Sequence, residues 1–250
     1  MSDLEASYEE VVDSYRDQFC HNARSLKIDP VTLFCSPAEQ IKKLRGWNKK
    51  YNLGLRSTDI DNPPEPPQPR LLKPFQAVNL RVCLEGKGEV SGVQRTFDEL
   101  WKIASAQYGG AWKWVLIRSE PEYLRVLPGS DYEPGLRWEV IDFVGNVAGK
   151  DPWEVTDPVK SPHAGILFAI AAHQNWVRNL EWLGLPDPVI SGYQLTLDDP
   201  GYEAWAEYVY FSFEIKGPGP HKGNINMMAS PFDAGGGAGS SHYALPDIIL

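Results

Sequence analysis

The segment Ser161–Leu185 constrains the fold of this chain more than any other. Ser161 suits a helix N-cap, and Pro162 suits the first helical position, where its missing N–H needs no partner. Gly184 suits a left-handed helix end, which Pro186 reinforces. Apolar residues recur between these ends at helical spacing, namely Ile166, Ile170, Val177 and Leu180. Because small or apolar residues occupy most other sides, we expect a central buried helix over 161–184 that includes His173.

Alternating apolar and polar residues predict several strands around this helix. The clearest pattern is Leu136–Val144, and similar patterns occupy residues 78–84, 112–118, 189–197 and 208–216. A capping-box pattern from Thr96 to Glu99 predicts another helix, which ends at Gly109. Because helices and strands do not alternate strictly, the sequence predicts an α+β fold, with a mixed or mainly antiparallel sheet packed on the central helix.

The N-terminal part has a different character, with a pair of amphipathic helices predicted over residues 4–22 and 36–50. Asn62–Pro69 then holds five prolines in eight positions, which favours an extended linker. We therefore predict four regions: an N-terminal helical module over 1–60, a Pro-rich linker over 61–74, an α+β core domain over 75–216, and a Gly-rich tail with few regular elements over 217–250.

Composition excludes some classes of protein. The formal net charge of −9 argues against wholesale nucleic-acid binding. Cys20, Cys35 and Cys83 form no paired motif, which is typical of reduced thiols in a cytoplasmic protein. Cys83 would need a base such as His173 to act as a nucleophile. We find no signal peptide, no apolar run long enough to span a membrane, and no metal or cofactor motif, so neither a metal nor a cofactor is predicted.

Three residues are candidates for acid–base chemistry: Asp142, Glu139 and His173. Asp142 lies on an apolar face of its predicted strand, where a carboxylate is a candidate for function. Its alternative role is to cap the loop that follows. His173 is more often a packed core residue in such a position, but it would complete an acid–base pair if folding brought it to Asp142. Arg137 would then hold an anionic group of the substrate.

The segment from Lys42 to Arg56 is a second candidate, because it is basic and contains no acidic residue. Trp47 and Tyr51 are interleaved with the basic side chains. Basic groups contact phosphates and aromatic rings stack on bases, so this pattern fits a nucleic-acid or anion site. It also fits the solvated side of an amphipathic helix. The candidate contacts are Lys42, Lys43, Arg45, Lys49 and Lys50.

One set of short motifs supports a family resemblance. The motifs are Leu136–Asp142, Asp157-Pro158, Ser161-Pro162, His173, Trp176-Val177 and Gly192-Tyr193. With these motifs, residues 121–211 resemble a family of uncharacterised bacterial proteins. The resemblance implies a bacterial, intracellular protein. It transfers no function, because no activity, cofactor or catalytic residue is established for that family.

The nine tryptophans and the lack of a complete catalytic signature favour a non-enzymatic binding or interaction module with a Trp-rich surface. Its predicted contact residues are Arg137, Trp138, Trp176, Tyr193, Trp112 and Trp114. The partner would be a protein or a small ligand. Two alternatives stay open: a hydrolase-like enzyme that uses Asp142 and His173 on a small molecule, and nucleic-acid or anion binding through Lys42–Arg56.

Overall fold

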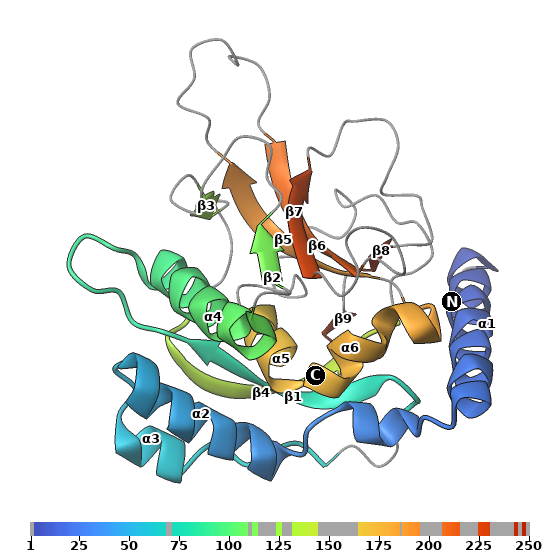
Figure 1. Cartoon of the computed structure of the whole chain (residues 1–250), viewed down its shortest axis with the longest axis horizontal. Coiled ribbons are helices and arrows are strands. Elements are labelled where there is room, and N and C mark those ends of the chain that lie inside the picture. The colour runs from blue at the N-terminus through green and yellow to red at the C-terminus, as the bar shows by residue number, and fades with distance from the viewer. Residues whose placement is uncertain are drawn as a thin grey trace.

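The chain combines helices with two β-sheets, which confirms the predicted α+β class. The structure is a computed structural model. It describes residues 3–68, 72–109, 112–114, 124–126, 132–144, 165–185, 187–195, 207–215, 225–230, 243–244 and 247–248. Figure 1 shows α4 between the two sheets, where it contacts β1 of the first sheet and β2 and β3 of the second.

The first sheet has three strands. Its middle strand, β4 (Gly135–Asp142), lies between β1 (Gln76–Cys83) and β9 (Asp247–Ile248). Both pairings are antiparallel, and Leu80 of β1 lies opposite Trp138 of β4. The alternation of apolar and polar residues therefore predicted β1 and β4 close to their observed ends.

The second sheet is mixed. Its strands in spatial order are β2 (Trp112–Trp114), β7 (Ile225–Ser230), β6 (Glu207–Ile215), β5 (Asp187–Leu195) and β3 (Leu124–Val126), and β8 (Tyr243–Ala244) pairs with β5. The β2–β7 and β5–β8 pairings are parallel, and the others are antiparallel. After residue 217 the described residues form β7, β8 and β9: β7 lies between β2 and β6, β8 pairs with β5, and β9 belongs to the first sheet. The predicted Gly-rich tail over 217–250 stays a prediction. Pairing with neighbouring strands supplies the hydrogen bonds that the Gly-rich composition does not indicate.

The helices are α1 (Asp3–Leu26), the short 3-10 helix η1 (Pro30–Leu33), α2 (Pro37–Tyr51), α3 (Ser57–Asp61), α4 (Gly92–Tyr108), α5 (Gly165–Ala172) and α6 (Gln174–Leu183). A full capping box between Ser36 and Glu39 opens α2. The start predicted for α4 at Thr96 is wrong, because Ser91 is the N-cap. Thr96 is buried, and its hydroxyl accepts a hydrogen bond from the Leu84 backbone N–H at 2.7 Å.

The predicted central helix over 161–184 is two helices, α5 and α6, which meet at His173. Residues 161–164 lie outside the described part of the chain, so the predicted N-cap is not described. At the other end Gly184 has a φ of +68°, and the Leu185 N–H donates to the Leu180 carbonyl at 2.9 Å. This is the left-handed glycine end predicted from the sequence. The described side chains of α5 are buried, and α5 contacts α4 and β1.

One hydrophobic core joins the segments on the two sides of the Pro-rich stretch. It contains Phe19 of α1 and Leu44 of α2, together with Leu80, Phe97 and Phe168 from later elements. The Pro-rich stretch itself is attached to β4, because Trp138 donates from Nε1 to the Pro64 carbonyl at 2.7 Å. The division into an N-terminal module, a linker and a core domain stays a prediction about organisation, but these regions share their packing.

A buried glutamine connects α2 to the edge of the first sheet. Gln40 donates from Nε2 to the Val78 carbonyl at 2.8 Å and accepts at Oε1 from the Leu80 N–H, also at 2.8 Å. These are the two hydrogen bonds that another strand would make at this edge. The Gln40 side chain thereby satisfies the edge of β1 where α2 crosses it.

Two glycine substitutions should have opposite effects on the free energy of unfolding. Gly184→Ala places a Cβ in a left-handed conformation, with Asn22 Nδ2 only 3.4 Å away, so we expect a loss of about 1 kcal/mol. Gly46→Ala adds a Cβ to an exposed site within α2 that meets no atom within 4 Å, and should gain about 0.5–1 kcal/mol. Urea unfolding of both variants checks this. Equal effects would contradict the assigned end of α6.

Candidate functional site

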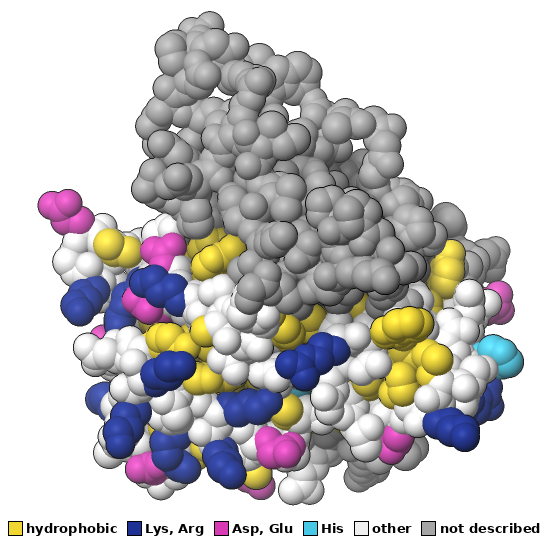
Figure 2. Space-filling model, in the orientation of Figure 1, with side chains coloured by type: hydrophobic (Ala, Val, Ile, Leu, Met, Phe, Trp, Pro, Cys, Tyr) yellow, Lys and Arg dark blue, Asp and Glu magenta, His cyan; other side chains and the backbone are white. Residues whose placement is uncertain are grey.

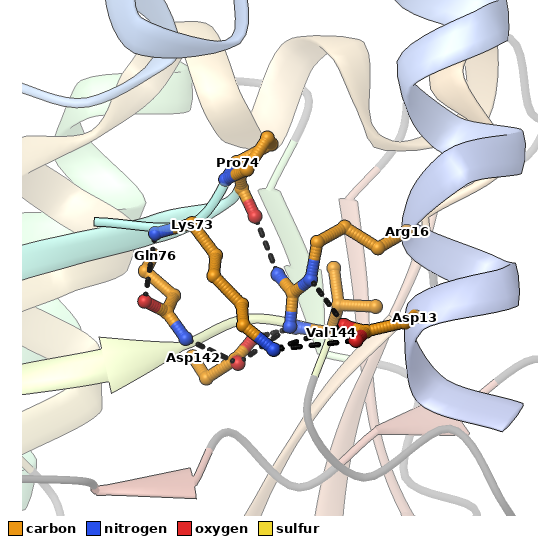
Figure 3. A network of polar contacts seen from close by, with 7 residues as sticks. All are labelled: Asp13, Arg16, Lys73, Pro74, Gln76, Asp142 and Val144. Carbon is orange, nitrogen blue, oxygen red and sulfur yellow. Dashed lines mark hydrogen bonds and ion pairs between the residues drawn. The ribbon is translucent and has the colours of Figure 1, made fainter. Parts of the chain in front are cut away.

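Asp142 is the centre of a buried polar network that joins α1 to the first sheet (Figure 3). Its Oδ2 accepts from Arg16 Nη2 at 2.7 Å and from Gln76 Nε2 at 2.8 Å. Its Oδ1 accepts from the Val144 N–H at 3.0 Å, which is the loop-capping role considered from the sequence. Arg16 also donates to the Pro74 carbonyl at 2.5 Å. The carboxylate therefore has structural partners at both oxygens.

A second buried acid, Glu139, lies between two arginines. Its Oε1 accepts from Arg81 Nη1 at 2.8 Å and from Arg137 Nε at 3.2 Å. Burial raises the pKa of Glu139 to about 7, and the neighbouring Arg81 guanidinium opposes that shift. Asn79 faces Glu139 across the β1–β4 pairing, and its Oδ1 accepts from no described group. Glu139 therefore forms ion pairs with both Arg137 and Arg81.

His173 is fully buried at the junction of α5 and α6. Its Nδ1 accepts from the Cys35 backbone N–H at 2.9 Å, so the neutral ring carries its proton on Nε2, which meets no described acceptor. Burial, reinforced by the charge of Lys43, lowers the pKa of His173 to about 3. Its neighbours are the rings of Phe34 and Phe143. The contacts of His173 and those of Asp142 involve different groups, so the described hydrogen bonds do not join the two as an acid–base pair.

Lys43 and Cys35 meet beside this junction. Lys43 Nζ lies 3.1 Å from Cys35 Sγ and also donates to the Ala172 carbonyl. Cys35 donates from Sγ to the same carbonyl at 3.1 Å. A continuous helix would direct the Ala172 carbonyl to the N–H four residues later. Two donors from the N-terminal part of the chain reach it instead, which gives a physical reason for the break at His173.

The position of Lys43 reduces the basic surface predicted for α2. Lys43 is directed inward, and Arg45 forms an exposed ion pair with Asp61 at 2.8 Å. Lys50 lies over the Tyr51 ring at 4.9 Å. Lys42 and Lys49 remain exposed. The arrangement matches the solvated side of an amphipathic helix more closely than a converging anion site.

Among the predicted aromatic contact residues, the described side chains of Trp176 and Trp138 are not fully exposed. Trp176 is only 1% exposed and packs against Phe34 and Phe143. Trp138 is half-buried under the Pro-rich stretch. Trp112 and Trp114 lie in β2 and Tyr193 in β5, but their side chains are outside the described residues.

A different tryptophan is exposed. Trp182 of α6 is 69% exposed, Val31 of η1 is 79% exposed and Leu26 of α1 is 42% exposed. α6 packs against both α1 and η1: Asn22 of α1 donates to the Leu183 carbonyl near the end of α6, and Asn175 near its start donates to the Thr32 carbonyl of η1. Figure 2 shows hydrophobic side chains gathered over this part of the molecule. We call the side chains of Trp182, Val31 and Leu26 the Trp182 surface.

The described residues include no group of three or more His, Cys, Asp or Glu side chains placed to hold a metal ion. Within the same residues, no helix is both long and apolar enough to cross a membrane. Comparisons with models of protein families, with curated proteins and with solved structures return no match. The resemblance to uncharacterised bacterial proteins therefore stays a prediction.

The sequence did not indicate that Cys35 contacts His173, that Arg16 pairs with Asp142, or that Trp182 is exposed. Cys35 is 138 positions from His173, and Arg16 is 126 positions from Asp142, so no local pattern joins either pair. Trp182 had a local signal, because it follows Asn175 and Arg178 at helical spacing on the polar side of α6. An aromatic residue on a polar helix face is a usable sign of exposure.

The Arg16–Asp142 pair should contribute far more to stability than a surface pair. Asp142→Asn leaves the buried Arg16 guanidinium without its counter-charge, and we expect a loss of about 3 kcal/mol or more in the free energy of unfolding. Asp61→Asn breaks the exposed pair with Arg45 and should cost less than about 1 kcal/mol. Chemical denaturation of both variants measures the difference. Similar small losses would show that Asp142 is not held as described.

His173 and Glu139 should make the free energy of unfolding depend on pH in opposite directions. In the unfolded chain His173 is protonated below about pH 6.5, whereas in the folded chain it stays neutral down to about pH 3. His173 therefore lowers the free energy of unfolding as the pH falls between these values. Folded Glu139 keeps its proton up to about pH 7, against 4.5 in the unfolded chain, so it reduces stability as the pH rises between these values. Unfolding of His173→Gln and Glu139→Gln across this pH range should therefore show slopes that depart from wild type in opposite directions. Parallel curves would refute both assignments.

Proposed function

We propose that this chain is a non-enzymatic protein-interaction module whose contact site is the Trp182 surface. The exposure of Trp182 carries the proposal. A tryptophan normally buries much of its large apolar area, and tryptophans dominate binding energy at interfaces. Trp182 instead presents most of its surface to solvent.

The charges around the Trp182 surface indicate the chemistry of the partner. Arg24 and Lys27 of the α1 end, and Arg178 of α6, are exposed, and none forms an ion pair with a described residue. Two acids are close in sequence: Glu181 directly precedes Trp182, and Asp29, two positions before Val31, has its carboxylate engaged as the cap of η1. A basic rim around an apolar centre fits a protein segment with an apolar anchor and acidic flanks.

The two alternatives have less support from the geometry. The hydrolase alternative needs Asp142 and His173 in contact, and each has other partners. The nucleic-acid alternative loses Lys43 from its surface. We also infer a cytoplasmic location, which the three free thiols support.

Substitution at Trp182 tests the proposal. Partners are recovered by affinity purification from native lysate, identified, and titrated as purified proteins against wild type, Trp182→Ser and Val90→Ser. Val90 is a matched control, because it is 45% exposed and lies away from this surface, in the loop before α4. We expect Trp182→Ser to raise Kd roughly thirtyfold, which corresponds to about 2 kcal/mol, and Val90→Ser to leave it unchanged. A partner that binds all three proteins equally, or no partner at all, would count against the proposal.

A further inference from the structure

The contact between Lys43 and Cys35 brings an amine and a thiol together in a half-buried position. Nζ lies 3.1 Å from Sγ, and both groups also bond to the Ala172 carbonyl. The shared carbonyl fixes the two side chains against each other. Lys43 belongs to α2, and Cys35 is the residue before the N-cap of the same helix.

Cys35 differs in this respect from the other two thiols. Burial raises the pKa of the Cys83 thiol, which also lies beside Arg81. Burial also raises the pKa of the Cys20 thiol. Both therefore favour the protonated, less reactive form. Cys35 alone among the three has an amine in hydrogen-bond contact with its sulfur.

We propose that Cys35 and Lys43 form a peroxide-responsive modification site, in which oxidation joins the two side chains through a reversible sulfur–nitrogen bond. In the first step the Cys35 thiol reacts with hydrogen peroxide to give a sulfenic acid and one water. Sulfur is oxidised and peroxide is reduced. Sulfenic acids condense with nearby nitrogen nucleophiles to form sulfenamides.

The second step uses the neighbouring amine. The Lys43 ammonium first releases one proton to solvent; the resulting amine attacks the sulfenic sulfur, an S–N bond forms, and the S–O bond breaks. The oxygen leaves as a second water that carries the hydroxyl proton and one amine proton. The chain therefore loses two hydrogens overall. A thiol reductant cleaves the S–N bond and restores both side chains.

The link would act on the junction between α5 and α6. The thiol proton that bonds to the Ala172 carbonyl is lost in the reaction, while the linked nitrogen keeps one N–H for that carbonyl. The link also ties Cys35, which precedes the N-cap of α2, to Lys43 within that helix. This modification is independent of the Trp182 surface and of its proposed partner.

Mass spectrometry of the purified full-length chain tests the proposal. After treatment with hydrogen peroxide, wild type should lose two hydrogens, and its digest should contain a peptide in which Cys35 and Lys43 are joined and trypsin does not cleave at Lys43. Dithiothreitol should reverse both changes. Lys43→Met should instead accumulate oxygen on Cys35. Lys42→Met, a control at the exposed neighbouring position, should behave like wild type.

Peptide mapping of wild type decides the outcome even if Lys43→Met folds poorly. Oxygen added to Cys35 while Lys43 remains open to trypsin would overturn the proposal. A disulfide from Cys35 to Cys20 or Cys83 has the same mass change, but it yields different linked peptides and would also overturn it. The same Cys35–Lys43 link in Lys42→Met completes the supporting result.

Discussion

The first sheet has an edge at β1 that no further strand covers among the described residues, and this constraint organises much of the molecule. β1 lies at one side of a three-stranded sheet, where its outward backbone groups need partners. Gln40 supplies a donor and an acceptor from one side chain, and this holds α2 across the edge. Removing α2 would expose both the edge and the apolar residues that pack there, including Leu44. The N-terminal helices are therefore part of the core.

The buried ion pair between Arg16 and Asp142 fixes α1 in the same way at the end of β4. Removing two charges from water is costly, and the pair is compensated only because Gln76, Pro74 and the Val144 N–H supply further hydrogen bonds. Such a network favours one placement of α1 over others, since a shifted helix would leave a buried charge alone. The same interactions that hold the fold together thus occupy the carboxylate that sequence reasoning proposed for catalysis.

The junction at His173 connects the fold to the proposed contact site. Lys43 and Cys35 bond to the carbonyl at the end of α5, and α6 then starts as a separate helix. α6 packs against α1 and η1, and Trp182 stands near its end. The sequence pattern suggested one long core helix, but the segment forms a buried helix, α5, and an amphipathic helix, α6. The second presents polar side chains and one tryptophan to solvent.

The sequence by itself determined the class of fold and several element ends. Alternation indicated β1 and β4, helical spacing indicated a helix over 36–50, and Gly184 marked the end of α6, because these signals depend on neighbouring residues. Only the tertiary structure decided which polar groups meet. Asp142 pairs with Arg16 and His173 with Cys35 across more than a hundred positions of chain. Hydrogen bonding and burial at such separations follow from packing, so local residue patterns cannot specify them.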